Sequence, residues 1–66
     1  MLPIKFTYMS SEYEQKVHVT IIGQLKHHFT GLTLYRVMEE GQTGWVDNGY
    51  FLEEKIQEWL RARVEE

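Results

Sequence analysis

The sequence contains no cysteine, and this absence excludes disulfide bonds, thiolate metal ligands and a cysteine nucleophile. Disulfides are rare inside cells, so a chain without cysteine fits a cytoplasmic protein, which we expect here. No stretch approaches the roughly 20 apolar residues of a transmembrane helix. Residues 1–9 also lack the charged segment and apolar run of a signal peptide. We therefore expect no membrane partner.

Motifs for chemistry are missing as well. The five glycines are scattered singly, and none forms the phosphate-cradling loop of a nucleotide-binding protein. Ser10 and Ser11 have no evident histidine to act as a base. His27 and His28 are adjacent, so on a strand they would point to opposite faces, and no cysteine completes a tetrahedral zinc site. We expect no enzyme, no metal, no cofactor and no small-molecule substrate.

What is present indicates a small folded domain. The 66 residues allow one domain, residues 1–66. A chain this short buries only about 60% of the surface of its unfolded form, so a partner would add stability. An aromatic content of 14% argues against disorder. The net charge of -3 weighs against general binding to phosphate backbones, without excluding a local basic patch.

The C-terminal part has the clearest pattern. Apolar residues recur there at helical spacing and predict an amphipathic helix over residues 50–64. Glu53 and Glu54 in its first turn and Arg61 and Arg63 in its last suit the helix dipole. The buried stripe consists of Leu52, Ile56, Trp59, Leu60 and Val64.

The preceding residues alternate between apolar and polar. This alternation predicts strands over residues 2–9, 16–22 and 31–38, and it allows a short strand over residues 43–46. Gly23 marks a bulge or a bend in a strand that continues to Leu25. Arg36 falls among the apolar positions of its strand, so its face must reach solvent or supply a carboxylate.

The segment from Asp47 to Gly49 has two interpretations. Asn-Gly is a strong hairpin signal, which would make residues 50–52 a fifth, very short strand. Alternatively, Asp47 or Asn48 caps the helix and Gly49 lies in its first turn. We favour the cap, because the helical stripe already includes Leu52 and two glutamates follow it.

Together these elements predict an α+β fold. It is a small antiparallel β-meander of three to four strands with one C-terminal amphipathic helix packed on one face. The predicted core combines residues from the strands and the helix: Ile4, Phe6, Val17, Val19, Ile21, Leu32, Leu34, Leu52, Ile56, Trp59 and Leu60.

If the helix covers the face that carries Val17, Val19 and Leu34, the opposite face keeps an apolar patch. Such patches tend to mark interfaces, and Trp is favoured at binding hot spots. Alternatively, residues 24–30 or 43–46 fold over this face and form a second small core. The predicted partner-binding residues are Met9, Ile22, Tyr35, Val37, Trp45 and Phe51.

These features favour a non-enzymatic module that binds another protein or a second copy of itself. We expect an accessory regulator or inhibitor of a larger protein, and by analogy a phage or mobile-element origin fits this profile. The alternative is a single-stranded nucleic-acid-binding domain, in which Tyr35 stacks on bases and the lysines follow the backbone. The acidic balance favours the protein partner.

One segment resembles a known family. Gly44-Trp45, followed by an amphipathic helix with Trp59, is similar to the small MbtH-like accessory proteins, which also have a three-stranded sheet and a helix. The chain lacks that family's Ser-x-Trp-Pro stretch before its Gly-Trp and its acidic-Arg-Pro ending. No residue role is therefore carried over.

Overall fold

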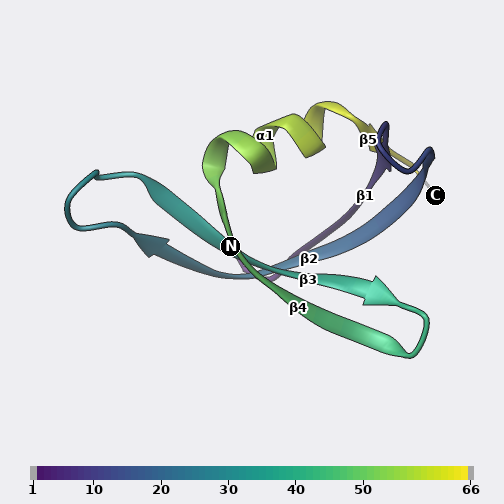
Figure 1. The fold of residues 1–66 in the computed structure, drawn as a ribbon, viewed down its shortest axis with the longest axis horizontal. Coiled ribbons are helices and arrows are strands. Elements are labelled where there is room, and N and C mark those ends of the chain that lie inside the picture. The colour runs from purple at the N-terminus through teal and green to yellow at the C-terminus, as the bar shows by residue number, and fades with distance from the viewer. Residues whose placement is uncertain (1, 66) are drawn as a thin grey trace.

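The computed structural model describes residues 2–65 and shows an antiparallel sheet with one helix on one of its faces (Figure 1). The spatial order of the five strands is β4-β3-β2-β1-β5. The predicted α+β meander with a C-terminal helix is confirmed. The elements are β1 (Ile4–Ser10), β2 (Gln15–Lys26), β3 (Thr33–Gly41), β4 (Gly44–Leu52), α1 (Glu53–Arg61) and β5 (Arg63–Val64).

A β-bulge lies in the middle of β2. Ile21 pairs with Val37, whereas Gly23 pairs with Arg36, so Ile22 is an extra residue with no partner on β3. Beyond the bulge β2 continues to Lys26, four residues past the predicted strand over residues 16–22 and one residue past Leu25, to which we expected the strand to continue. The predicted bulge near Gly23 is confirmed.

A second bulge replaces both interpretations of the segment from Asp47 to Gly49. Asn48 and Gly49 together lie opposite the single β3 residue Val37, so neither a helix cap nor a hairpin turn forms here. Gly49 has a φ of 79°, a conformation that glycine adopts without steric cost. Asn-Gly suits this bulge as well as a turn, and α1 begins only at Glu53.

The core lies between α1 and the sheet. Trp59 of α1 stacks on Tyr8 and contacts Phe51, with 5.0 Å between ring centroids in both pairs. Leu60 packs half-buried against this core. Six of the predicted core residues are buried, and they are joined by Val37: the set is Phe6, Val17, Val19, Ile21, Val37, Ile56 and Trp59.

Other predicted core residues lie outside it. Ile4, Leu32 and Leu52 are 41%, 51% and 43% exposed, respectively. Leu34 pairs with Leu25 and Leu52 on the side of the sheet away from α1. Leu34 and Leu52 therefore lie on the face that α1 does not cover, and Leu52 belongs to β4 and not to the predicted helical stripe.

The predicted faces of β3 are reversed. The pairing of Ile21 with Val37 places Val37 and Tyr35 on the α1 side, and sends Leu34 and Arg36 to the other side. β3 carries apolar residues on both faces, so alternation alone did not identify the inner one. A shift of one residue in register exchanges the two faces of a strand.

The helix is shorter than predicted. It ends at Arg61. The chain then turns, and Val64 of β5 pairs with Thr7 of β1. The Met9 N–H donates to the Ala62 carbonyl over 3.0 Å. Val64 has the sequence spacing of the predicted helical stripe, but it is not in the helix. It lies in β5, whose backbone covers part of the outer edge of β1.

Substitution should separate the core from the uncovered face. Val37→Ala is expected to lower the free energy of unfolding by about 2 kcal/mol, because it leaves a cavity at a fully buried position. Ile22→Ala, at a position 42% exposed, should change it by less than about 0.5 kcal/mol. Urea denaturation measures both, and equal effects would contradict the observed orientation of β3.

Candidate protein-binding face

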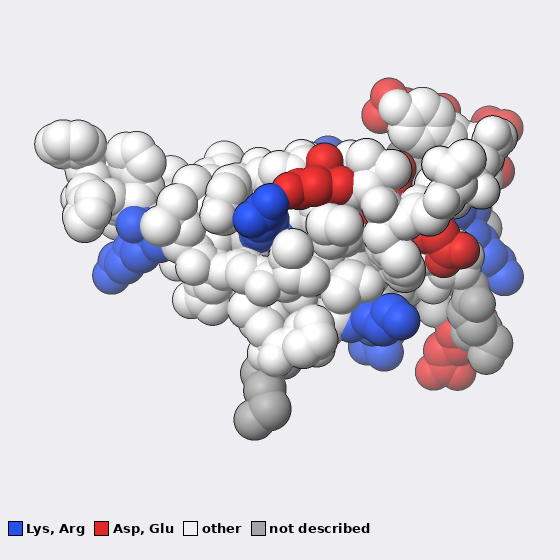
Figure 2. Space-filling model, turned by 90° about the horizontal axis from the view of Figure 1, so that it is seen from below, with Lys and Arg blue, Asp and Glu red and all other residues white. Residues whose placement is uncertain are grey.

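The side of the sheet away from α1, here called the open face, is assigned by strand pairing. Lys5 pairs with Thr20, Thr20 with Met38, and Met38 with Asp47, so these four side chains form one row across the sheet. Figure 2 shows the molecule from this side. Uncharged atoms cover most of the surface, and one basic and one acidic group touch near its middle.

An apolar hollow occupies part of the open face. Trp45 and Ile22, which are 41% and 42% exposed, are among the residues that line it. The Lys5 ammonium lies 5.6 Å from the centroid of the Trp45 ring, within the range of a cation-π contact. We call this set the open-face cluster, and it comprises Pro3, Lys5, Thr20, Ile22, Met38 and Trp45.

A row of leucines continues the apolar surface toward the β2–β3 hairpin. Leu25 pairs with Leu34, and Leu34 pairs with Leu52, so one leucine from each of three strands lies side by side. Leu25 and Leu52 are each close to half exposed. Tyr50, which is 51% exposed, belongs to the neighbouring row with Arg36.

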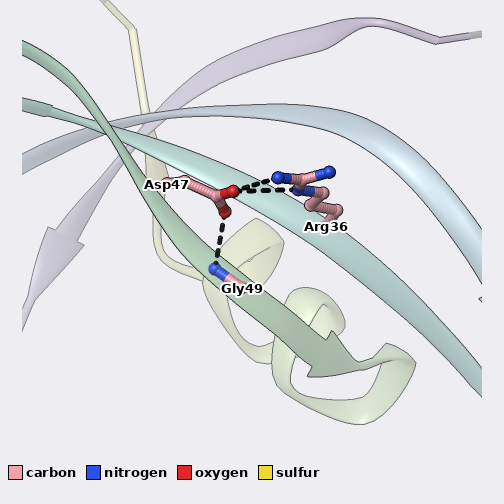
Figure 3. A network of polar contacts seen from close by, with 3 residues as sticks. All are labelled: Arg36, Asp47 and Gly49. Atoms are coloured by element: carbon pink, nitrogen blue, oxygen red, sulfur yellow. Dashed lines mark hydrogen bonds and ion pairs between the residues drawn. The ribbon is translucent and has the colours of Figure 1, made fainter.

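Arg36 and Asp47 form an ion pair on the open face (Figure 3). Arg36 lies in the row next to the leucines, and Asp47 lies in the row of Met38. Arg36 donates to Asp47 Oδ2 through Nε at 3.0 Å and through Nη2, and the Gly49 N–H donates to Asp47 Oδ1 at 2.9 Å. The bulge in β4 therefore presents the carboxylate to Arg36. We expected Arg36 to reach solvent or a carboxylate, and the structure shows that it reaches both.

These contacts change the acidity of the pair. Hydrogen bonds from Arg36 and then from the Gly49 N–H hold the pKa of Asp47 below its usual 3.8. The same hydrogen bond to Asp47 raises the pKa of Arg36. Because the pKa of Asp47 is lowered in the folded state, the contribution of this carboxylate to stability is present above pH 3.8 and is lost as the pH falls through the lowered pKa.

Arg36→Gln should raise the pKa of Asp47 toward its usual value. The rise should be incomplete, because the Gly49 N–H still donates to the carboxylate. An NMR titration of the side-chain carboxyl carbon measures the pKa, and Arg61→Gln, which removes an arginine from α1, should leave it unchanged. An ordinary pKa in the unsubstituted protein would show that the pair does not form in solution.

Two threonines on the open face differ in hydrogen bonding. Thr7 is buried, and its Oγ1 lies 2.8 Å from His18 Nδ1. The Thr20 hydroxyl is buried and has no hydrogen-bond partner among residues 2–65. A buried polar atom without a partner lowers stability, and an apolar group of the same shape removes that cost.

Thr20→Val is therefore expected to raise the free energy of unfolding by about 1 kcal/mol, since valine also suits a strand. Thr7→Val provides the matched comparison. It should lower the free energy of unfolding by about 1 kcal/mol, because it removes the hydrogen bond to His18. Thermal and urea denaturation of both variants test this, and destabilisation by Thr20→Val would show that its hydroxyl is satisfied.

The structure divides the predicted partner-binding residues between the two sides of the sheet. Ile22 and Trp45 meet in the open-face cluster, and Met9 is exposed elsewhere on β1. Val37 is fully buried under α1, so it cannot line an exposed patch. Tyr35 and Phe51 pair with each other and pack half-buried against the core.

The other open-face residues were missed for identifiable reasons. Met38 lies on the open face because of the register of β3, and the alternation of apolar and polar residues did not determine that register. Tyr50 and Leu52 were assigned to the helix, although β4 extends to Leu52. Residues 24–26 pair with β3 and residues 27–30 form the turn of a projecting hairpin, so this segment does not fold over the open face (Figure 1).

Comparison with known proteins does not assign this face a role. A scan against protein-family models, a search of curated proteins and a search of solved structures found no match. The similarity of the Gly44-Trp45 segment to MbtH-like proteins therefore has no support from a family match.

Two further findings concern metals and membranes. Within residues 2–65, no three histidine, aspartate or glutamate side chains are grouped so that they could hold a metal ion. The described part of the chain also has no helix with the length and apolar character to cross a membrane.

Proposed function

We propose that this chain is a non-enzymatic protein-binding module that docks through its open face and acts as an accessory regulator or inhibitor of a larger protein. The observation that carries the proposal is the open-face cluster with the adjoining leucine row. Exposed apolar residues are normal when they occur singly, whereas contiguous ones typically mark an interface.

The composition of the open face supports a protein partner. Tryptophan, tyrosine, methionine and arginine are enriched at protein interfaces, and Trp45, Tyr50, Met38 and Arg36 all lie on this side. The central charges on Arg36 and Asp47 already neutralise each other, so a partner need not supply a charge there. Nucleic-acid binding on this face is less favoured, because Tyr35 lies on the α1 side.

The rigidity of the open face also supports the proposal. Apart from Pro3, its side chains lie on strands, and the β3 backbone beneath them pairs on both sides, with β2 and β4. A surface that needs little reordering keeps more of its interaction energy as affinity.

Affinity capture from lysate with variants on opposite sides of one strand tests the proposal. Trp45→Ala removes the main anchor of the open-face cluster and should weaken capture at least about 30-fold, the usual effect at a hot spot. Its neighbour Val46 is 51% exposed but pairs with Glu39 on the α1 side, so Val46→Ala should capture as well as the unsubstituted chain.

Nuclease treatment and sedimentation complete the experiment. A protein that is retained after nuclease and lost only with Trp45→Ala supports the proposal. Conversion of a dimer to a monomer by Trp45→Ala would identify the partner as a second copy of the chain. Equal capture by both variants, with circular dichroism showing both folded, would refute docking through this face.

A further inference from the structure

A projecting hairpin forms one end of the molecule. Strands β2 and β3 continue past the part of the sheet beneath α1 and reach far to one side (Figure 1). This hairpin contributes to an elongated shape, with extents of 36, 24 and 22 Å. We call residues 24–35 the arm.

Hydrogen bonds shape the turn at the tip of the arm. The His27 N–H donates to the Leu32 carbonyl at 2.8 Å, and the Gly31 N–H donates to the His27 carbonyl at 2.9 Å. The Thr30 N–H donates to His27 Nδ1 at 3.3 Å. Gly31 has a φ of 72°, a conformation that glycine adopts readily. The tip is therefore a structured turn.

This turn presents Phe29 to solvent. The Phe29 side chain is 96% exposed, and its ring centroid lies 6.0 Å from that of His27 at an angle of 55°. Exposing an entire phenyl ring forgoes the favourable free energy of burying it. Its position on a bonded turn makes it available to a ligand.

The sequence on both sides of the tip contains basic residues and no acidic ones. None of the ten acidic residues of the chain falls within residues 15–38, which contain three lysines and arginines and all three histidines. Lys26, His27 and His28 immediately precede Phe29. In Figure 2 the projecting end shows basic and no acidic colour, whereas acidic groups gather at the other end. Glu53 and Glu54 of α1 line a hollow together with Leu32 and Thr33, next to the turn, so they are the acidic side chains that border this basic segment.

The chain contains a natural comparison at the β1–β2 turn. Tyr13 is 66% exposed there, but it lies between Glu12 and Glu14. The molecule thus presents one exposed aromatic ring in an acidic setting and another, Phe29, in a basic setting. Of these two rings, only Phe29 with its basic neighbours suits an anionic ligand with flat apolar groups.

We infer that the arm tip binds single-stranded nucleic acid, with the Phe29 ring stacked on an unpaired base and Lys26 and His28 directed to the neighbouring phosphates. Base stacking on aromatic rings combined with basic side chains is the usual way in which proteins hold single strands without sequence preference. An unpaired base is available without the cost of unstacking a duplex.

The composition of the tip favours this ligand over a lipid surface. Phe29 is the one large apolar side chain among residues 26–30, and the others are a lysine, two imidazoles and a hydroxyl. Binding to a membrane interface scales with the apolar area that is buried, and one phenyl ring supplies little of it. The tip and the open-face cluster share no residue. The arm also contributes Leu25 and Leu34 to the leucine row, so the test below changes neither of them.

Fluorescence anisotropy with a short labelled oligothymidylate tests the inference on the full chain at low ionic strength. Phe29→Ala should weaken binding about 10-fold, the usual effect of removing one stacked ring. Tyr13→Ala is the matched control and should leave the affinity unchanged. Lys26→Glu should weaken binding and reduce its salt dependence. Lys55→Glu, which changes the net charge equally from α1, should have a smaller effect.

Each outcome decides the inference. Loss with Phe29→Ala and Lys26→Glu but not with the two controls supports it. Absence of binding by the unsubstituted chain, or equal loss with Tyr13→Ala, overturns it. Tighter binding to phosphatidylglycerol vesicles than to the oligonucleotide, again dependent on Phe29, would overturn it in favour of a membrane-binding tip. Because Trp45 lies outside the arm, none of these results affects the capture test of the open face.

Discussion

The pairing of Ile21 with Val37 is the contact on which the rest of the structure depends. It buries both side chains beneath α1 and sets the register of β3 against β2. Because side chains alternate along a strand, this one pair sends Arg36 and Met38 to the opposite side. The extra residue Ile22 follows directly, so the bulge and the composition of the open face both result from the same register.

The small size of the helix explains why the sheet has so much exposed apolar surface. Helix α1 has nine residues and buries only Ile56 and Trp59. A sheet whose strands reach twelve residues extends well beyond that cover. The uncovered parts are the open face and the arm, and these carry the two proposed binding sites. The small area that α1 covers thus explains why both proposed binding sites are exposed.

The free edges of the sheet are protected by different means. Part of β1 is covered by the two residues of β5, whereas the outer edge of β4 is interrupted by the bulge at Asn48 and Gly49. A bulge makes a long edge strand a poor template for another chain. Pairing with another chain is therefore less favourable along these two parts of the edges.

The sequence by itself determined strands β1 to β3, the presence of one C-terminal helix and six of the seven buried core residues, because the helical stripe around Trp59 and the alternation of Val17, Val19 and Ile21 are local patterns of burial. It also placed a bulge or a bend at Gly23, next to the extra residue Ile22 of the observed bulge. Only the tertiary structure decided which face of β3 is buried, where the helix starts and that Asn48-Gly49 forms a bulge. β3 is apolar on both faces and Asn-Gly suits several conformations, so pairing with other strands selected among locally equivalent arrangements.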